Sequence, residues 1–286
     1  MNKAPARAAP DAPAEDERRK ESDEAEERSA PTGRVVYKAI LSEGESELER
    51  SSSALFWSGL AAGLSMGFSL FGEGLLMAHL PDSPWRPLLA KFGYCFGFVA
   101  VVLGRQQLFT ENTLTPILPL LQHRDAKTFA NVARLWSIVL VANLIGAAAV
   151  GAVAVLTPAF DADVQRSFLE IGRTELAPGF GVTLLRGIFA GWLIALMVWL
   201  MPFAETSRLW VIIGVTYLVG LGGFAHIIAG AVAASAAAAA GEASVASIVL
   251  GWGVPCLLGN IVGGVVLVAL VNHAQVVGGG DGGNDL

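Results

Sequence analysis

Six long apolar segments follow one another along this chain, and they constrain its fold more than any other feature. They run approximately over residues 54–80, 88–121, 129–156, 179–201, 209–239 and 246–274. A helix needs about 20 mostly apolar residues to cross the hydrocarbon core of a bilayer. The sequence therefore predicts an all-α membrane protein with six transmembrane helices. An even number of spans places both termini on the same side of the membrane.

Charged residues are concentrated before the first span. Residues 1–50 contain 22 Lys, Arg, Asp and Glu residues, and the remaining 236 residues also contain 22. Soluble domains have a charged fraction of about one quarter, so most of this chain cannot be an ordinary soluble enzyme. The net charge of -6 argues against a nucleic-acid surface, and no nucleic-acid partner is expected.

Composition divides the chain into four parts. Residues 1–33 are predicted to be a disordered charged tail, because they contain too few large apolar residues to offset the chain entropy. Residues 34–52 are an amphipathic pre-membrane segment, either a helix at the membrane surface or a solvated linker. Residues 53–275 form a six-helix transport domain, and residues 276–286 form a disordered Gly-rich tail.

The expected location is the plasma membrane, with the protein integral and multi-pass. The short loops carry basic residues on both sides, so they do not decide the orientation. The tail contains many basic residues and no apolar export signal. Both termini are therefore expected to be cytoplasmic.

The second and fifth apolar segments are each interrupted. In the second, the apolar run stops at GRQQ (residues 104–107) and resumes through LFTENT (residues 108–113). In the fifth, it stops at GLGG (residues 220–223) and resumes at FAH (residues 224–226). Backbone that leaves a helix at membrane depth is tolerated only where protein or a water-filled cavity satisfies its polar groups. Interruptions in matching places of two halves point to a transport site.

The two halves also match in sequence, which indicates a duplication. ANLIGA around Asn143 resembles GNIVGG around Asn260, at an offset of 260 − 143 = 117 residues. The two interruptions align at Phe109 and Phe224, at an offset of 224 − 109 = 115 residues. Because three is odd, the second copy must be inverted in the membrane. The expected fold is two inverted three-helix repeats with broken second and fifth helices.

The strings GRQQLFTENTLTP, FAHIIAG and LLGNIVGG, in this order and spacing, resemble the formate/nitrite transporter family over about residues 53–275. They look most like its YfdC-type branch, whose substrate is poorly defined. The resemblance implies an aquaporin-like six-helix fold and a homopentamer with one pore in each protomer. It also implies passage of formate, nitrite or similar small monovalent anions, often together with a proton.

The resemblance also assigns residues to the pore. The central pore histidine of the family falls on His226, and the threonine of its mobile loop falls on Thr110. The constriction residues fall on Leu108 and Phe109, and Phe224 lies in the second interruption.

This sequence departs from the family pattern at four places near the pore, one of which is an arginine, Arg105, in the second-span interruption. Formate channels commonly have an acidic residue and an asparagine where this chain has Ala225 and Gly230. A pore-facing asparagine of the fourth span corresponds to Gly191. These differences leave open which small anion is carried.

The residues suggest how an anion would pass. His226 begins the second half of a broken helix, and a half-helix N-terminus carries about +0.5 charge and free N–H groups. Histidine is the side chain best placed to lend a proton near neutral pH. We expect a weak-acid anion to take a proton at His226 and to cross Phe109 and Leu108 as the neutral acid. The Thr110 hydroxyl can bond to His226 or to the substrate.

Other polar residues of the spans need partners. An intramembrane arginine is costly and usually paired or functional. Arg105 either attracts the anion or, as the favoured alternative, forms a clamp with Glu111, and Glu111 and Asn112 are candidate caps of the next half-helix. Glu73 and Arg186 are expected to pair between the first and fourth spans.

Two other functions remain open. One is a neutral small-solute pore, although the paired Asn-Pro-Ala motifs of such pores are missing from the sequence. The other is a non-transporting scaffold or sensor that uses the acidic tail. No enzyme activity is expected, because the sequence shows no nucleophile–base set, and no metal or cofactor is expected, because no Cys/His cluster has ligand spacing. The expected partners are small monovalent anions, protons and the lipid bilayer.

Overall fold

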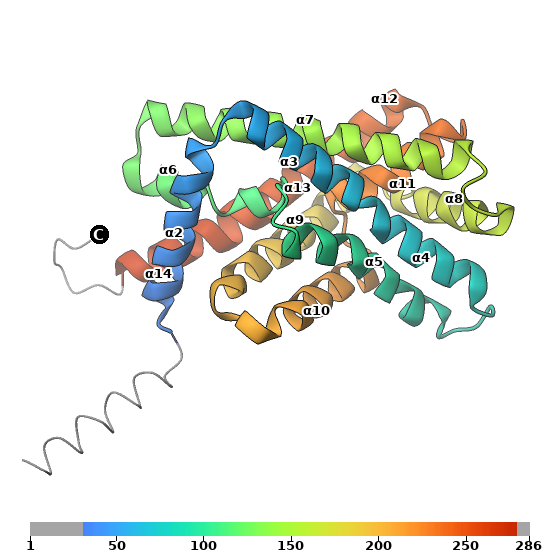
Figure 1. Ribbon diagram of the computed structural model, residues 1–286, viewed down its shortest axis with the longest axis horizontal. Helices are drawn as coiled ribbons and strands as arrows, with labels where there is room; N and C mark the ends of the chain where they lie inside the picture. Colours follow the sequence, from blue (N-terminus) through green and yellow to red (C-terminus); the bar gives the residue numbers. More distant parts are fainter. Residues whose placement is uncertain (1–30, 279–286) are drawn as a thin grey trace, which may run out of the picture.

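The computed structural model describes residues 31–278, and within this range it is all-helical, with no strand. Its helices pack into one elongated bundle (Figure 1). Five helical stretches of the described chain are long and apolar enough to cross a membrane. They are Ser52–His79, Arg86–Leu103, Ala126–Leu156, Phe180–Phe203 and Val245–Gly278.

Most of these stretches combine several elements. The first joins α3 (Ser52–Ser65) to α4 (Gly67–His79), the second is α5 (Arg86–Leu103) and the third is α7 (Ala126–Leu156). The fourth is α9 (Phe180–Leu200) with the short 3₁₀ helix η2 (Met201–Phe203), and a second such helix, η3 (Glu205–Ser207), follows it. The last stretch consists of α12 (Val245–Ser247), the π-helix η4 (Ile248–Gly253), α13 (Val254–Ile261), the π-helix η5 (Val262–Leu270) and α14 (Val271–Gly278).

The second and fifth apolar segments of the sequence do not form continuous helices. After α5 ends at Leu103, only the 3₁₀ helix η1 (Glu111–Thr113) precedes α6 (Ile117–His123). The fifth segment is divided into α10 (Arg208–Leu221) and α11 (Ile227–Ala239), and neither half is long enough to count among the five stretches. Gly223 lies in this second break with φ +59°, a left-handed conformation that glycine adopts without strain.

Helix α2 (Gly33–Glu49) occupies most of the predicted pre-membrane segment. Its buried face includes Tyr37 and Ile40, and it packs on α6 and α14. The Tyr37 hydroxyl is 2.8 Å from Nδ1 of His273, so the two ends of the described chain lie together. We call this end of the bundle the α2 side (left in Figure 1).

A second amphipathic helix, α8 (Ala162–Leu176), lies at the other end of the bundle and packs against α4 and α11. We call this end the α8 side. At the C-terminus, α14 continues to Gly278, so residues 276–278 of the predicted Gly-rich tail are helical. The rest of that tail and residues 1–30 of the charged tail lie outside the described residues.

A buried asparagine on α7 fixes the first break. The Oδ1 of Asn143 accepts a hydrogen bond of 2.9 Å from the Phe109 N–H. Its Nδ2 donates to the carbonyls of Gly59 at 2.7 Å and Gln107 at 2.9 Å. One side chain therefore satisfies two backbone groups of the break and joins them to α3.

Asn260 on α13 does the same at the second break. Its Oδ1 accepts from the Ile227 N–H at 2.9 Å, and its Nδ2 donates to the carbonyls of Gly187 at 2.9 Å and Ala225 at 2.8 Å. The two asparagines are fully buried and bind matching sets of backbone groups. Similar hydrogen-bonding positions therefore recur in both halves of the chain.

These bonds correct the predicted alignment of the breaks. They make Phe109 the counterpart of Ile227 and Gln107 the counterpart of Ala225, an offset of 118 residues (227 − 109 and 225 − 107). Phe109 and Phe224 are therefore not equivalent. The predicted alignment matched two phenylalanines by residue type. The correct alignment matches the two residues whose backbone N–H groups donate to Asn143 and Asn260. By the same offset, Leu108 is the counterpart of His226.

The asparagine contacts generate a prediction about stability. Asn143→Ala and Asn260→Ala should each lower the free energy of unfolding by about 3 kcal/mol or more, because each leaves buried backbone groups unpaired. Thermal unfolding of the purified protein in mild detergent measures this loss. Asn272→Ala is the matched control, because among the described residues the Asn272 side chain bonds only to the Val268 carbonyl, one turn earlier in the same helical stretch, at 2.9 Å. Equal losses in all three variants would contradict the role of Asn143 and Asn260 in supporting the two breaks.

Candidate functional site

The two breaks meet at a hydrogen bond between Thr110 and His226. Thr110 Oγ1 lies 2.7 Å from His226 Nε2, and both side chains are at most 1% exposed. Thr110 directly precedes η1, and His226 is the N-cap of α11. The structure thus brings together two residues that are 116 positions apart in the sequence and were both predicted as pore residues.

The second ring nitrogen of His226 fixes the hydrogen-bonding roles. Nδ1 lies 3.1 Å from the Ala229 N–H, which can only donate, so Nδ1 accepts and carries no proton. In the neutral ring the proton is therefore on Nε2, and Nε2–H donates to the Thr110 hydroxyl oxygen. The hydroxyl hydrogen of Thr110 remains able to donate to a further acceptor.

Apolar side chains surround this pair. Leu108 and Phe109, the predicted constriction residues, are at most 1% exposed. The Phe109 ring packs edge-on against Trp136 of α7, at 5.6 Å between centroids. The ring that meets His226 is Phe98 of α5, at 4.9 Å and edge-on. Phe224 instead stacks on Phe189 of α9, with centroids 5.2 Å apart.

A cavity approaches this apolar region from each end of the bundle. The α2-side cavity has a volume of about 80 Å³ and is lined by residues of the first break, including Arg105, Gln107 and Asn112. The α8-side cavity has a volume of about 280 Å³ and reaches Gly223 in the second break. His226 lines neither cavity, so buried side chains separate the two.

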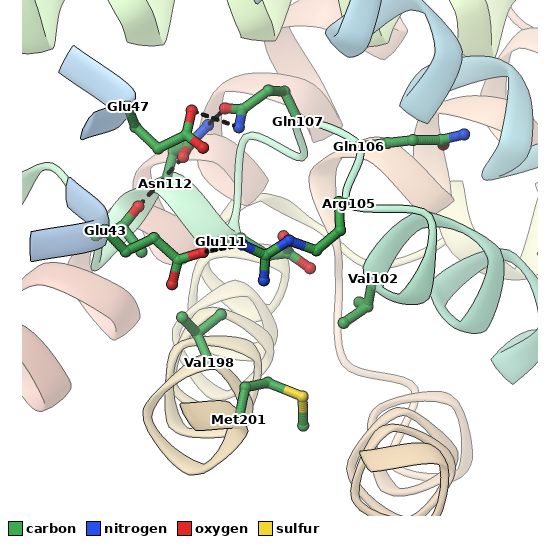
Figure 2. A pocket seen from close by; sticks show the side chains of 11 residues that line it. Glu43, Glu47, Val102, Arg105, Gln106, Gln107, Glu111, Asn112, Val198 and Met201 are labelled. Carbon is green, nitrogen blue, oxygen red and sulfur yellow. Dashed lines mark hydrogen bonds and ion pairs between the residues drawn. The ribbon is translucent and has the colours of Figure 1, made fainter. Parts of the chain in front are cut away.

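Helix α2 forms one wall of the α2-side cavity (Figure 2). Glu47 accepts a hydrogen bond of 2.7 Å from Gln107 Nε2, and Gln107 Oε1 accepts one of 2.9 Å from Asn112 Nδ2. Asn112 in turn accepts from the Thr115 hydroxyl at 3.3 Å. This chain of hydrogen bonds connects α2 to the backbone of the first break.

The favoured partner of Arg105 was predicted incorrectly. Its guanidinium forms an ion pair of 3.1 Å with Glu43 of α2, and the side chain is 75% exposed. Glu111 lies beside this pair in the cavity, and its buried Oε1 has no hydrogen bond among the described residues (Figure 2). Neither Glu111 nor Asn112 caps α6, whose N-cap position is Pro116. The sequence misled here because α2 contributes carboxylates that are distant in the chain.

The predicted pair of Glu73 and Arg186 is also wrong. Glu73 is bound by Lys91 of α5, with Nζ and Oε1 only 2.5 Å apart. Lys91 lies on the helix that packs most directly against α4, so it reaches the carboxylate first. Arg186 remains on the wall of the α8-side cavity.

Gly191 does not face the passage, although the family pattern places a pore-facing asparagine there. A Cβ at Gly191 would collide with the backbone of Asn260, including its carbonyl oxygen. Glycine at this position therefore permits the close approach of α9 and α13. The departure from the family pattern has a packing reason.

Three site residues were missed by the sequence analysis. Gln107 supplies a carbonyl to Asn143 and a side chain to α2, and the correct repeat offset identifies it as the counterpart of Ala225. Phe98 was hidden among the apolar residues of its span and carried no distinguishing signal. Glu175 of α8 was overlooked because its helix is not a predicted span, yet its carboxylate accepts from Trp252 Nε1 at 3.0 Å.

Comparisons with known proteins agree with this geometry. The sequence profile described as Formate/nitrite transporter matches residues 34–274. The chain is 37% identical to the Inner membrane protein YfdC of Escherichia coli (strain K12), over 92% of this chain and 84% of that protein.

Two solved structures share the fold. One, described as a pentameric formate channel with formate bound, has a TM-score of 0.67 and 21% identity, over 79% of this chain and 98% of that one. The other, an FNT family ion channel, has a TM-score of 0.68 and 18% identity, over 84% and 98%.

The helical fold and the two facing breaks define an integral membrane protein of the channel and transporter class. The chain belongs to the formate/nitrite transporter family. The resemblance stated from the sequence motifs is therefore confirmed, including the likeness to YfdC.

The contacts of α2 generate a prediction. Glu47→Ala should raise amide hydrogen exchange in α2 by about tenfold or more, because it removes a charge-assisted hydrogen bond to Gln107. Hydrogen–deuterium exchange with mass spectrometry measures the change. Glu49→Ala is the matched control, because Glu49 is exposed on the same helix. An unchanged exchange rate in Glu47→Ala would show that the bond between Glu47 and Gln107 does not hold α2 in place.

Proposed function

We propose that this protein is a channel or transporter for small monovalent weak-acid anions, coupled to proton transfer at His226. The observation that carries the proposal is the buried hydrogen bond of 2.7 Å between Thr110 and His226, where the two breaks meet between two cavities. A titratable group placed there meets every solute that crosses. Membership of the formate/nitrite transporter family supports the same substrate class.

The proposed architecture consists of six spans in two inverted repeats. The second span comprises α5 and α6, and the fifth comprises α10 and α11. The matching bonds of Asn143 and Asn260 support this arrangement. We further propose that the α2 side faces the cytoplasm, that the membrane is the plasma membrane, and that residues 53–275 are the transport domain.

The proposed passage proceeds through a neutral intermediate. An anion in hydrocarbon-like surroundings is costly, and a proton removes most of that cost. The anion first accepts a hydrogen bond from the Thr110 hydroxyl. A second proton, taken up from water together with the anion, adds to the ring at Nδ1 and displaces the Ala229 N–H from it, and the nearby negative charge offsets the cost of this change. The imidazolium then gives one proton to the anion, and the neutral acid crosses Leu108 and Phe109.

The proposed assembly is a homopentamer with one passage in each protomer. A solved relative in fold is described as pentameric. Large apolar side chains on the outside of the bundle, such as Phe129 and Trp210, are available to lipid or to a second copy. The passage proposed for each protomer lies within its own helices.

The central experiment replaces the histidine. His226→Asn keeps a side chain that can accept the Ala229 N–H at the N-cap of α11, so the fold should remain. Flux of formate and nitrite into proteoliposomes should rise in the wild type as the external pH falls from about 8 to about 6, because a proton enters with each anion and the bound anion favours the charged ring. The variant should lose this proton-coupled component by about a hundredfold, in line with the loss of a general acid.

Two further variants and one solute make this test decisive. His79→Asn is the matched control, because His79 is exposed and bonds to the carbonyl of Leu75 in its own helix. Thr110→Val should cause a smaller loss, since it removes a hydroxyl but no titrating group. Unchanged flux and pH profile in His226→Asn would make the histidine structural, and rapid glycerol flux would then favour a neutral-solute pore.

A further inference from the structure

The α8-side cavity contains several charged side chains, and most of them already have partners. Glu73 pairs with Lys91 at 2.5 Å, and Asp82 pairs with Arg86 at 3.5 Å. These pairs neutralise one another, so they present little net charge to a solute. The cavity also contains Arg186, whose surroundings are different.

Arg186 forms no ion pair with any carboxylate of residues 31–278. It extends from α9 to the second break, where its Nη1 lies 3.8 Å from the position a Cβ would have on Gly223. Phe224 follows directly, and His226 lies two residues further along the chain. The guanidinium therefore stands where the cavity meets the break.

Arg186 is a positively charged side chain within an apolar stretch that is long enough to cross a membrane. An arginine within a span is costly unless it is paired or lines a water-filled cavity with a function. Its planar fork of N–H groups fits the two oxygens of a carboxylate or of nitrite. Of the carboxylates that line the cavity, Glu73 is bound by Lys91, Asp82 pairs with Arg86, and Glu175 accepts a hydrogen bond from Trp252. The fork of Arg186 is thus left to a ligand from solution.

We infer that Arg186 is an anion-capturing residue, which binds a small planar oxyanion in the α8-side cavity before the anion reaches His226. The inference rests on the proposed function for the direction of passage. It adds to the proposed function a binding step before proton transfer, the residue that carries out this step, and a preference for planar oxyanions. Two oxygen atoms on one central atom, as in a carboxylate or nitrite, allow the bidentate contact that a spherical halide cannot make.

Glu175 controls how strongly Arg186 attracts the anion. Trp252 holds the Glu175 carboxylate at 3.0 Å, and the same carboxylate lies only 2.7 Å from the position a Cβ would have on Gly230. Any side chain at Gly230 would also collide with the Trp252 ring. The glycine that stands in place of the family's common asparagine therefore makes room for this carboxyl group at the first turn of α11.

The charge of Glu175 depends on pH near neutrality. Burial, and to a smaller extent the charge of Glu73, raise the pKa of Glu175, whereas the bond from Trp252 and the charges of Lys91 and Arg186 lower it. The net result is a pKa of about 7. Other titratable groups that act on it or share the cavity are Tyr94 and Cys256, which face it from α5 and α13, and Glu170 of its own helix. Below about pH 7 the carboxyl is neutral and leaves the Arg186 charge uncompensated. Above that pH its negative charge competes with the anion.

Binding to the purified full chain in detergent tests the inference without requiring transport. Nitrite is the probe, and the shift in thermal unfolding temperature with nitrite concentration gives the dissociation constant. Arg186→Gln should weaken binding by about tenfold or more, because a charge-assisted bidentate contact is lost. Arg186→Met should give the same result, and it keeps the test valid if the glutamine variant does not fold. Arg186→Lys should retain part of the affinity.

Arg173→Gln is the matched control. Arg173 also lies on the α8 side, but it is exposed and paired with Glu242 outside the cavity. Wild-type affinity in both Arg186→Gln and Arg186→Met would overturn the inference, as would an equal loss in Arg173→Gln. Chloride at the same ionic strength should give no comparable stabilisation, and equal stabilisation would show a general salt effect only.

The pH dependence of nitrite binding tests the role of Glu175. Wild-type affinity for nitrite should fall severalfold between about pH 6 and about pH 8, and Glu175→Gln should remove this dependence while binding stays tight. A Glu175→Gln variant with the full wild-type pH dependence would reject the control by Glu175. Nitrite binding that depends on Arg186 without any flux in proteoliposomes would reject the proposed function but keep this site. Flux in proteoliposomes together with unchanged nitrite binding in Arg186→Gln would reject this site but keep the proposed function.

Discussion

Backbone groups that leave a helix inside a membrane must find partners in the protein, and the rest of this structure depends on how two asparagines supply them. Asn143 and Asn260 each bind one N–H and one carbonyl of a break and one carbonyl of a neighbouring helix. Without these bonds, each break would expose polar groups that hydrocarbon cannot satisfy. With them, irregular backbone becomes a rigid support. Thr110 and His226 can then be held within hydrogen-bonding distance of each other.

The sequence predicted what depends on hydrophobicity and on short motifs. The long apolar stretches and the positions where α5 and α10 end followed from these features, and His226 was one of the two partners that the sequence offered for Thr110. The alignment of the two breaks did not, because letter similarity between Phe109 and Phe224 carries no information about which N–H faces an asparagine. The hydrogen bonds give that register directly.

Charged partners were the least predictable part of the site. Arg105 pairs with Glu43 and Glu73 pairs with Lys91, and both partners come from helices other than those expected. An apolar pattern indicates which residues are buried, but it does not indicate which of several nearby carboxylates an arginine reaches. Helix α2 illustrates the difficulty, since its amphipathic pattern did not distinguish membrane contact from packing on the protein. Its carboxylates turn out to line the cavity next to the first break.

The buried side chains between the two cavities have a consequence for the energetics of the cell. Leu108, Phe109 and Phe98 are buried and His226 lines neither cavity, whereas a continuous file of water at His226 would conduct protons along its hydrogen bonds. In the proposed mechanism, a proton crosses only together with a solute that occupies the gap between the two cavities. Exclusion of water would then be as important for coupling as the chemistry of the histidine.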